Sequence, residues 1–159
     1  MNAYIIAMTP KRIRYLLDGK IKKEVKINCP RGSVPFKCYV YCPIKKYQTK
    51  RMHNRAMSDT GNEYDEWQGK VVAEFVCTEM RPVPKLPPLN FFDETRISSE
   101  EYERYKTRSA SSMRTLTITE LREYIKPRSL DRYITVKGKP VDSIKGAFTN
   151  VEEDVDETD

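Results

Sequence analysis

Alternating apolar and polar positions along the chain predict a series of short strands. Residues 3–8 are almost wholly apolar and favour a first strand, whereas 22–28 carry so much charge that we expect a second strand at a sheet edge. Residues 36–42 alternate strictly and predict a third strand. The longest strand signal runs from 69 to 80, and 132–137 predict the last strand.

A short helix is predicted directly after the first strand. Thr9 is a residue type preferred at helix N-caps, and Pro10 suits the first helical position. Gly19 is placed to end the helix. The apolar residues at helical spacing are Ile13, Leu16 and Leu17. Several cations lie off this apolar stripe, so the outer face of the helix should be cationic: Lys11, Arg12 and Arg14.

Two later segments share the pattern of a capping box and predict two further helices. Ser98 precedes Glu101 by three residues, and Thr117 precedes Glu120 in the same way. The first of these helices should fade near Lys106, and the second should end before Pro127.

The order of predicted elements indicates a fold class. Too few helices separate the strands for a doubly wound parallel sheet, so we expect an α+β fold, a small mixed β-barrel whose helices cap its ends. Residues 43–68 predict a long loop inserted in this barrel, and residues 81–95 are proline-rich and irregular. The expected organisation is one domain over 1–148, followed by an acidic, disordered tail over 149–159.

Charge is unevenly distributed along the chain. The formal net charge is +6, but the last eight residues hold six of the 23 acidic residues and no base. The rest of the chain has 29 basic and 17 acidic residues, a net charge of +12. A basic body suggests a polyanionic partner such as RNA or another nucleic acid, with the tail shielding the basic face. A soluble domain with a solubilising end explains the same distribution, and so does a host protein as the partner.

The four cysteines (Cys29, Cys38, Cys42, Cys77) predict reduced thiols, mostly buried, since a chain of 159 residues needs no disulfide framework. Cys38 and Cys42 lie four apart in a predicted strand, about 13 Å, too far to share one zinc ion. The one histidine, His53, lies in the predicted loop, so we expect no metal and no cofactor. No apolar run approaches the roughly 20 residues of a membrane helix, and the N-terminus does not resemble a signal peptide, which favours a cytoplasmic protein.

Five segments of the chain carry recognisable motifs: Thr9-Pro10, Gly19 to Lys26, Pro35 to Cys42, Gly69 to Cys77 and Leu116 to Tyr124. These motifs resemble those of the ASCH family, in the versions common in phage and prophage proteins. Together they span roughly residues 3–148, and the segments at 35–42 and 69–77 are the most specific. The resemblance implies a PUA-like barrel that associates with RNA or modified nucleotides.

The chain also departs from this family's pattern. The family's Gly-x-Lys-Thr is here Gly19-Lys20-Ile21-Lys22, its arginine is Lys26, and a usual glycine is Ala73. Some ASCH proteins are amidohydrolases on acetylated cytidine that use a lysine and a threonine. This chain has Ile21 and Glu24 at the aligned positions, so that machinery does not carry over.

The best-supported candidate site is a charged group on the second strand. Lys20, Lys22, Glu24 and Lys26 should share one face, with Lys11 and Arg12 of the first helix beside them. The cations would hold phosphates while Glu24 accepts a hydrogen bond from a base, at the mouth of the barrel. A charged edge strand that prevents aggregation is the structural alternative. A hydrolase or ribonuclease with Lys20 or Lys22 as nucleophile and Glu24 as base is the enzymatic alternative, and Lys22 with Glu24 are its catalytic candidates.

Three aromatic residues are further candidates for the binding site. Tyr39 and Tyr41 should lie on the strand face opposite Cys38, where they could stack on a base, and Trp67 could cover a ligand. Aromatic residues in strands are also common core residues, so packing in the interior is the competing interpretation.

Overall fold

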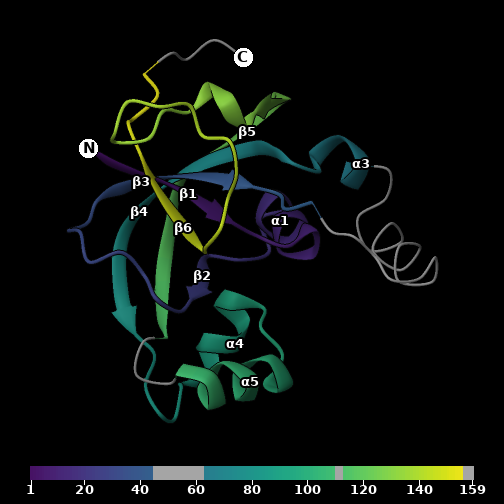
Figure 1. The fold of residues 1–159 in the computed structure, drawn as a ribbon. Coiled ribbons are helices and arrows are strands. Elements are labelled where there is room, and N and C mark those ends of the chain that lie inside the picture. The colour runs from purple at the N-terminus through teal and green to yellow at the C-terminus, as the bar shows by residue number, and fades with distance from the viewer. Residues whose placement is uncertain (45–62, 110–112, 156–159) are drawn as a thin grey trace.

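A mixed, six-stranded sheet forms the centre of the described part of the chain. The computed structural model describes residues 1–44, 63–109 and 113–155. The strands are β1 (Asn2–Ala7), β2 (Lys23–Lys26), β3 (Phe36–Tyr41), β4 (Lys70–Pro82), β5 (Arg114–Ser129) and β6 (Phe148–Val151). Their spatial order is β2-β5-β4-β3-β1-β6, with β1 and β3 parallel and the other neighbours antiparallel. Figure 1 shows the sheet curling into a half-barrel.

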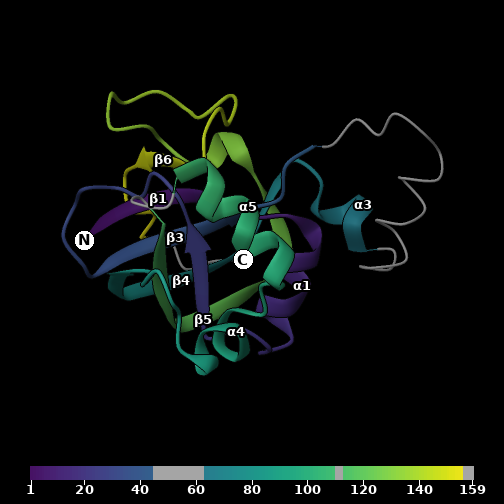
Figure 2. The ribbon, with the colours of Figure 1, turned by 90° about the horizontal axis from the view of Figure 1, so that it is seen from below.

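A few short helices accompany this sheet. They are α1 (Pro10–Leu17), α3 (Glu63–Trp67), α4 (Leu89–Thr95) and α5 (Ser99–Ser109), with a 3-10 turn, η2, at Leu130–Arg132. Figures 1 and 2 show α4 and α5 lying together near β2, whereas α3 stands apart from them. The predicted α+β class with a curled mixed sheet is confirmed.

Helix α1 begins and ends where the sequence predicts. The Thr9 hydroxyl accepts a hydrogen bond from the Arg12 backbone N–H at 3.4 Å. Ile13 and Leu16 are buried in the main core, and Gly19 follows the helix with a φ of +71°, a conformation that glycine adopts without steric cost. This left-handed turn reverses the chain toward β2.

Both faces of the sheet are buried, each by a different cluster. The predicted alternation in β3 is confirmed, since Phe36, Cys38 and Val40 pack on the α1 side and Tyr39 and Tyr41 on the other. The second cluster is closed by residues that come late in the chain: Tyr133, Val141 and Val151.

In β4 the regular alternation of side chains breaks at one end. Val71 and Ala73 lie two residues apart and would share a face in a regular strand, but a register irregularity between them moves Val71 to the cluster on the opposite face. A β-bulge adds a residue to one strand and so shifts the alternation by one position.

The helix predicted between Thr117 and Pro127 is wrong, because these residues lie in the long strand β5. Thr115, Thr117, Ile118 and Thr119 are β-branched and favour extended backbone. The strand pairs with β2 and β4, and it accommodates Glu120 with a φ of +50°. Tertiary pairing therefore outweighs the capping-box pattern.

The capping box before α5 is confirmed. The Ser98 hydroxyl accepts a hydrogen bond from the Glu101 backbone N–H at 3.1 Å. Ile97 and Tyr102 are buried together in the cluster under α4 and α5, as a hydrophobic staple requires. The helix continues to Ser109, three residues beyond the predicted end.

Other predicted boundaries also change. The last strand was predicted at 132–137, but only isolated bridges at Ile134 and Thr135 occur there, and β6 is the last strand. The segment 81–95 contains α4, and the predicted loop 43–68 contains α3, while residues 45–62 lie outside the described part. Residues 149–151, which the sequence assigns to the tail, lie in β6.

Candidate nucleic-acid interface

Strand β2 separates its charged side chains onto two faces. Glu24 contacts α1, whereas Val25 packs with Phe91 and Tyr102 under α4 and α5. Lys20 and Lys22 precede the strand, in the turn that leaves α1. The structure therefore brings Glu24 and Lys26 together, but it does not place all four predicted residues on one strand face.

A buried ion pair joins α1 to β2. Arg12 donates from Nε (3.2 Å) and from Nη2 (2.6 Å) to Oε1 of Glu24, whose side chain is 2% exposed. The third guanidinium nitrogen, Nη1, donates to the backbone carbonyl of Thr95 at 2.6 Å, at the C-terminal end of α4. The Val25 backbone N–H also donates to Oε1 of Glu24 at 2.9 Å. These bonds tie α1, β2 and α4 together, and the structure does not present Glu24 to a base.

Lys26 lies beside this pair and is half-buried. Its Nζ donates to the backbone carbonyl of Ala7, at the end of β1. Burial lowers the pKa of Lys26 from its ordinary value, and the nearby Glu24 carboxylate partly opposes that shift. Arg12, Glu24 and Lys26 together form a charged group with one excess positive charge beneath α1.

Two exposed lysines lie close to the ring of Tyr15, which is itself half-buried against the core. The Nζ atoms of Lys11 and Lys20 each lie 5.7 Å from the centroid of the Tyr15 ring. Lys22, also exposed, follows in the same turn, which is fixed by its backbone N–H to the Glu94 carbonyl at 2.8 Å. We call Lys11, Tyr15, Lys20 and Lys22 the basic surface.

The aromatic candidates from the sequence lie in the core. Tyr39 is 0% exposed, packs on Tyr133 at a ring-centroid distance of 4.7 Å, and its hydroxyl oxygen accepts from the Asp154 backbone N–H at 2.7 Å. Tyr41 is buried in the same cluster. Trp67 is buried in the α1-side core beneath the guanidinium of Arg14, 5.1 Å from the ring centroid. None of these three rings lies on the basic surface.

The structure adds residues that the sequence did not single out. Tyr105 of α5 is half-buried near Glu24 and Arg12, and burial raises its pKa. Tyr105 lies three residues after the buried Tyr102 on the same helix, and this spacing is the sequence signal that predicts an inward-facing side chain. Thr95 contributes only a backbone carbonyl to the Arg12 site, so its side chain carries no signal for this contact.

A second buried carboxylate lies on the opposite side of the sheet from α1. Glu74 of β4 is bound by Lys37 Nζ at 2.7 Å, by the Tyr124 hydroxyl at 3.0 Å and by Arg122 Nη1 at 3.5 Å. A polar cavity of about 500 Å³ adjoins it, bordered by Asp154 and other residues near the end of the described chain. A glutamate amid the apolar residues of a central strand is the sequence signal for this group.

The four cysteines are free in the structure, and Cys38, Cys42 and Cys77 are buried. Burial raises the pKa of Cys29 and of Cys77 to about 11, and it also raises the pKa of Cys38. These three thiols are therefore protonated at neutral pH, a state in which a thiol is a poor nucleophile. Within the described ranges no helix is long and apolar enough to cross a membrane.

Comparison with solved structures decides the fold. Neither a protein-family model nor a curated protein sequence matches this chain. The crystal structure of ASCH from Zymomonas mobilis is similar to it, with a TM-score of 0.55 and 14% sequence identity over 82% of this chain and 75% of that one. The chain has the ASCH fold. Two single-residue mutants of the Zymomonas mobilis protein each give a TM-score of 0.52 at 12% identity.

Ile21 marks a departure of this chain from the ASCH motif that residues 19–26 resemble. Where the family motif has lysine, Ile21 is 4% exposed and packs in the core on the α1 side of the sheet. Lys20 and Lys22, on either side of it, are exposed. The positive charge that the motif would place at one position is here found at its two neighbours, on the surface.

Proposed function

We propose that this protein binds RNA or another single-stranded nucleic acid at the basic surface of α1 and the α1–β2 turn. The observation that carries the proposal is the pair of exposed ammonium groups, Lys11 and Lys20, that both lie close to the Tyr15 ring. Cations close to an aromatic ring suit a strand whose phosphates contact lysine while a base packs on the ring.

The buried charged group supports this surface from beneath. Arg12 anchors α1 to Glu24 and to the end of α4, so the backbone that carries Lys11 is fixed relative to β2. A preorganised surface binds more tightly, because less conformational entropy is lost on binding. The net charge of +12 outside the last eight residues favours the same class of partner. The proposal includes a cytoplasmic location. It also includes the phage or prophage origin that the motif resemblance implies.

A salt titration tests the proposal. The affinity for a fluorescein-labelled single-stranded RNA is measured by fluorescence anisotropy from 50 to 300 mM salt. Three phosphate contacts, by Lys11, Lys20 and Lys22, correspond to a slope of about −2 in log K against log salt concentration. An absence of binding to any single-stranded RNA or DNA at the lowest salt concentration would overturn the proposal. A protein partner captured after nuclease treatment would favour the alternative from the sequence, a phage-encoded protein that interacts with a host protein.

One observation favours a hydrolase as the second candidate. Lys26, whose pKa burial lowers, lies near the Glu24 carboxylate, and a lysine of lowered pKa can act as a nucleophile. Incubation with acetylated cytidine and with RNA, followed by chromatography, tests this candidate. Activity lost in Lys26→Met and Glu24→Gln but kept in Lys22→Ala would assign the reaction to the interior group. No product with any of these substrates removes the candidate.

A further inference from the structure

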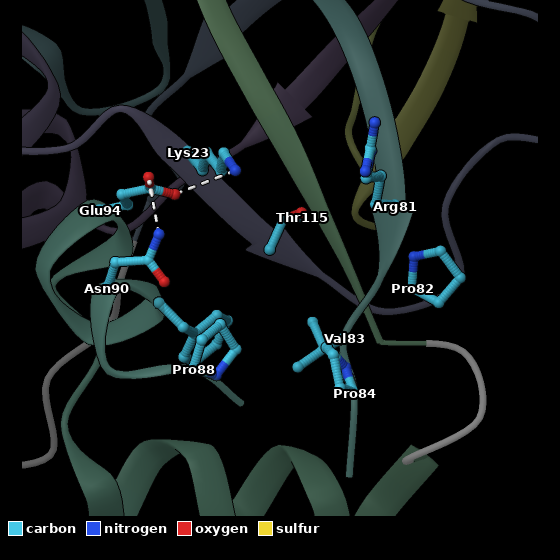
Figure 3. A pocket seen from close by; sticks show the side chains of 10 residues that line it. Lys23, Arg81, Pro82, Val83, Pro84, Pro88, Asn90, Glu94 and Thr115 are labelled. Atoms are coloured by element: carbon cyan, nitrogen blue, oxygen red, sulfur yellow. Dashed lines mark hydrogen bonds and ion pairs between the residues drawn. The ribbon is translucent and has the colours of Figure 1, made fainter. Parts of the chain in front are cut away.

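A cavity of about 490 Å³ lies between α4 and the ends of β2, β4 and β5. Figure 3 shows it from close by. It is reached from the face of β2 that carries Lys23, whereas Glu24 and the Arg12 pair lie on the other face. This volume falls within the range of pockets that hold small organic ligands, about 300–1,000 Å³.

Two apolar walls face each other across the cavity. In Figure 3, Pro82, Val83 and Pro84 lie on one side and Pro88 on the other. The buried Phe91 of α4 also lines the cavity. Proline has no side-chain rotamers to lose, and valine has few, so these walls keep their shape without a ligand. Two fixed apolar walls suit a flat ring inserted between them.

Polar groups border the cavity at defined places. The Lys23 ammonium pairs with Glu94 Oε2 at 2.9 Å, and the Asn90 amide donates to Glu94 Oε1 over a long 3.5 Å. The Asn90 side-chain oxygen and the Thr115 hydroxyl have no hydrogen-bond partner among the described residues. An amide and a hydroxyl with spare donors and acceptors can read the edge of a heterocyclic base.

The charge of the lining favours an anionic ligand. Lys23 and Arg81 contribute two positive charges and Glu94 one negative charge. The Arg81 side chain is 73% exposed, and its partner Glu79 does not line the cavity. A phosphate carried by the ligand would find a cation on either side of the opening.

We propose that this cavity takes one unpaired base of a bound single-stranded nucleic acid, with an adjoining phosphate beside Lys23 or Arg81. The inference rests on the proposed function. It adds to the basic surface a second contact, on the face of β2 that carries Lys23. The base packs between the proline-rich wall and Pro88, and its edge meets Asn90 and Thr115. Recognition of a base that is out of its stack is the usual route to sequence preference in RNA binding.

The test is an NMR titration of the full chain with the four nucleoside 5′-monophosphates, with ribose 5-phosphate as the base-free control. We expect saturable shifts of the backbone amide signals of Lys23, Asn90 and Thr115 with at least one nucleotide. Ribose 5-phosphate should bind at least tenfold more weakly. Equal affinity for ribose 5-phosphate, or shifts confined to other parts of the chain, would overturn the inference.

Two variants sharpen the test. Asn90→Trp fills the cavity from an exposed helix position and should weaken nucleotide binding at least tenfold, while Thr115→Val removes only the hydroxyl and should weaken it about threefold. If RNA binds through the basic surface but neither variant changes its affinity and no nucleotide shifts these signals, the inference fails and the proposed function stands. If neither RNA nor any nucleotide binds, both fail. A leucine-containing acidic peptide that shifts these signals where nucleotides do not would also overturn the inference.

Discussion

Arg12 donates two hydrogen bonds to the same carboxylate oxygen of Glu24, and both partners are shielded from water. The pair lies beneath the helix that carries Lys11, so it connects the stability of the fold to the position of the basic surface. A buried pair of this kind depends on both partners, because removal of either one leaves the charge of the other buried without compensation.

We therefore expect Arg12→Met to lower the free energy of unfolding by about 3–5 kcal/mol, because Glu24 stays buried without its partner. Urea denaturation followed by circular dichroism measures this cost. The double variant Arg12→Met with Glu24→Leu should recover most of it, since no buried charge is then left in the pair. The matched control is Asp18→Ala, which breaks the exposed Arg14–Asp18 pair and should cost less than about 1 kcal/mol. Equal costs for Arg12→Met and Asp18→Ala would contradict this account.

The second prediction concerns the basic surface. Lys11→Ala with Lys20→Ala should lower the salt slope of RNA binding by about 1.4, because each lost phosphate contact on a single strand removes about 0.7. Fluorescence anisotropy at several salt concentrations measures the slope. Lys137→Ala with Lys139→Ala, at two exposed positions elsewhere, should leave it unchanged. A slope that falls equally in both double variants would show that the basic surface has no special role.

The buried thiols give a pH dependence of stability. The pKa of Cys29 and of Cys77 rises from 9.0 to about 11 on folding, so the unfolded chain loses these protons at lower pH than the folded chain. Their contribution to stability is therefore fully present below pH 9 and is lost as the pH rises toward 11. The urea midpoint should fall between pH 9 and pH 10.5.

Lys26 acts in the opposite direction in the alkaline range. Its pKa is lowered on folding, so the unfolded chain keeps this proton to higher pH and the stability contributed by Lys26 rises with pH below 10.5. Comparison with Cys29→Ala plus Cys77→Ala isolates the contribution of the thiols. The decline above pH 9 should be shallower in this variant, and an unchanged decline would assign the effect to other groups.

A fourth prediction concerns Glu74, which is bound by Lys37 and Tyr124 on the face of the sheet opposite α1. Glu74→Leu should lower the free energy of unfolding by about 3–5 kcal/mol, because both partners lose their acceptor. Lys37→Met should cost less, since Tyr124 and Arg122 still bind the carboxylate. Urea denaturation gives both values, and RNA affinity should be unchanged in folded Lys37→Met. A cost of Glu74→Leu below 1 kcal/mol would contradict this prediction.

The local parts of the fold could be predicted from the sequence because they depend on neighbouring residues. The Thr9 cap, the Gly19 turn and the Ser98–Glu101 capping box each involve residues within a few positions of one another. Leu116 to Tyr124 carries the same capping pattern, but its backbone pairs with β2 and β4, and the sequence pattern does not reveal such distant partners.

The candidate site was predictable in part for a related reason. The sequence placed Arg12, Glu24 and Lys26 near one another, and the structure does the same. It could not predict that Tyr39 would be buried, because alternation in β3 shows which face a side chain takes but not what covers that face. The covering residues, among them Tyr133 and Val151, come about 100 residues later in the chain.

Ultraviolet crosslinking of a single-stranded RNA to the protein, followed by mass spectrometry of the digested complex, tests the central claim most directly. The account predicts crosslinks within residues 11–26, with Tyr15 between Lys11 and Lys20 as the main site. It also predicts that these crosslinks decline with rising salt. RNA crosslinked only to segments outside 11–26, with Tyr15 unmodified, would contradict it.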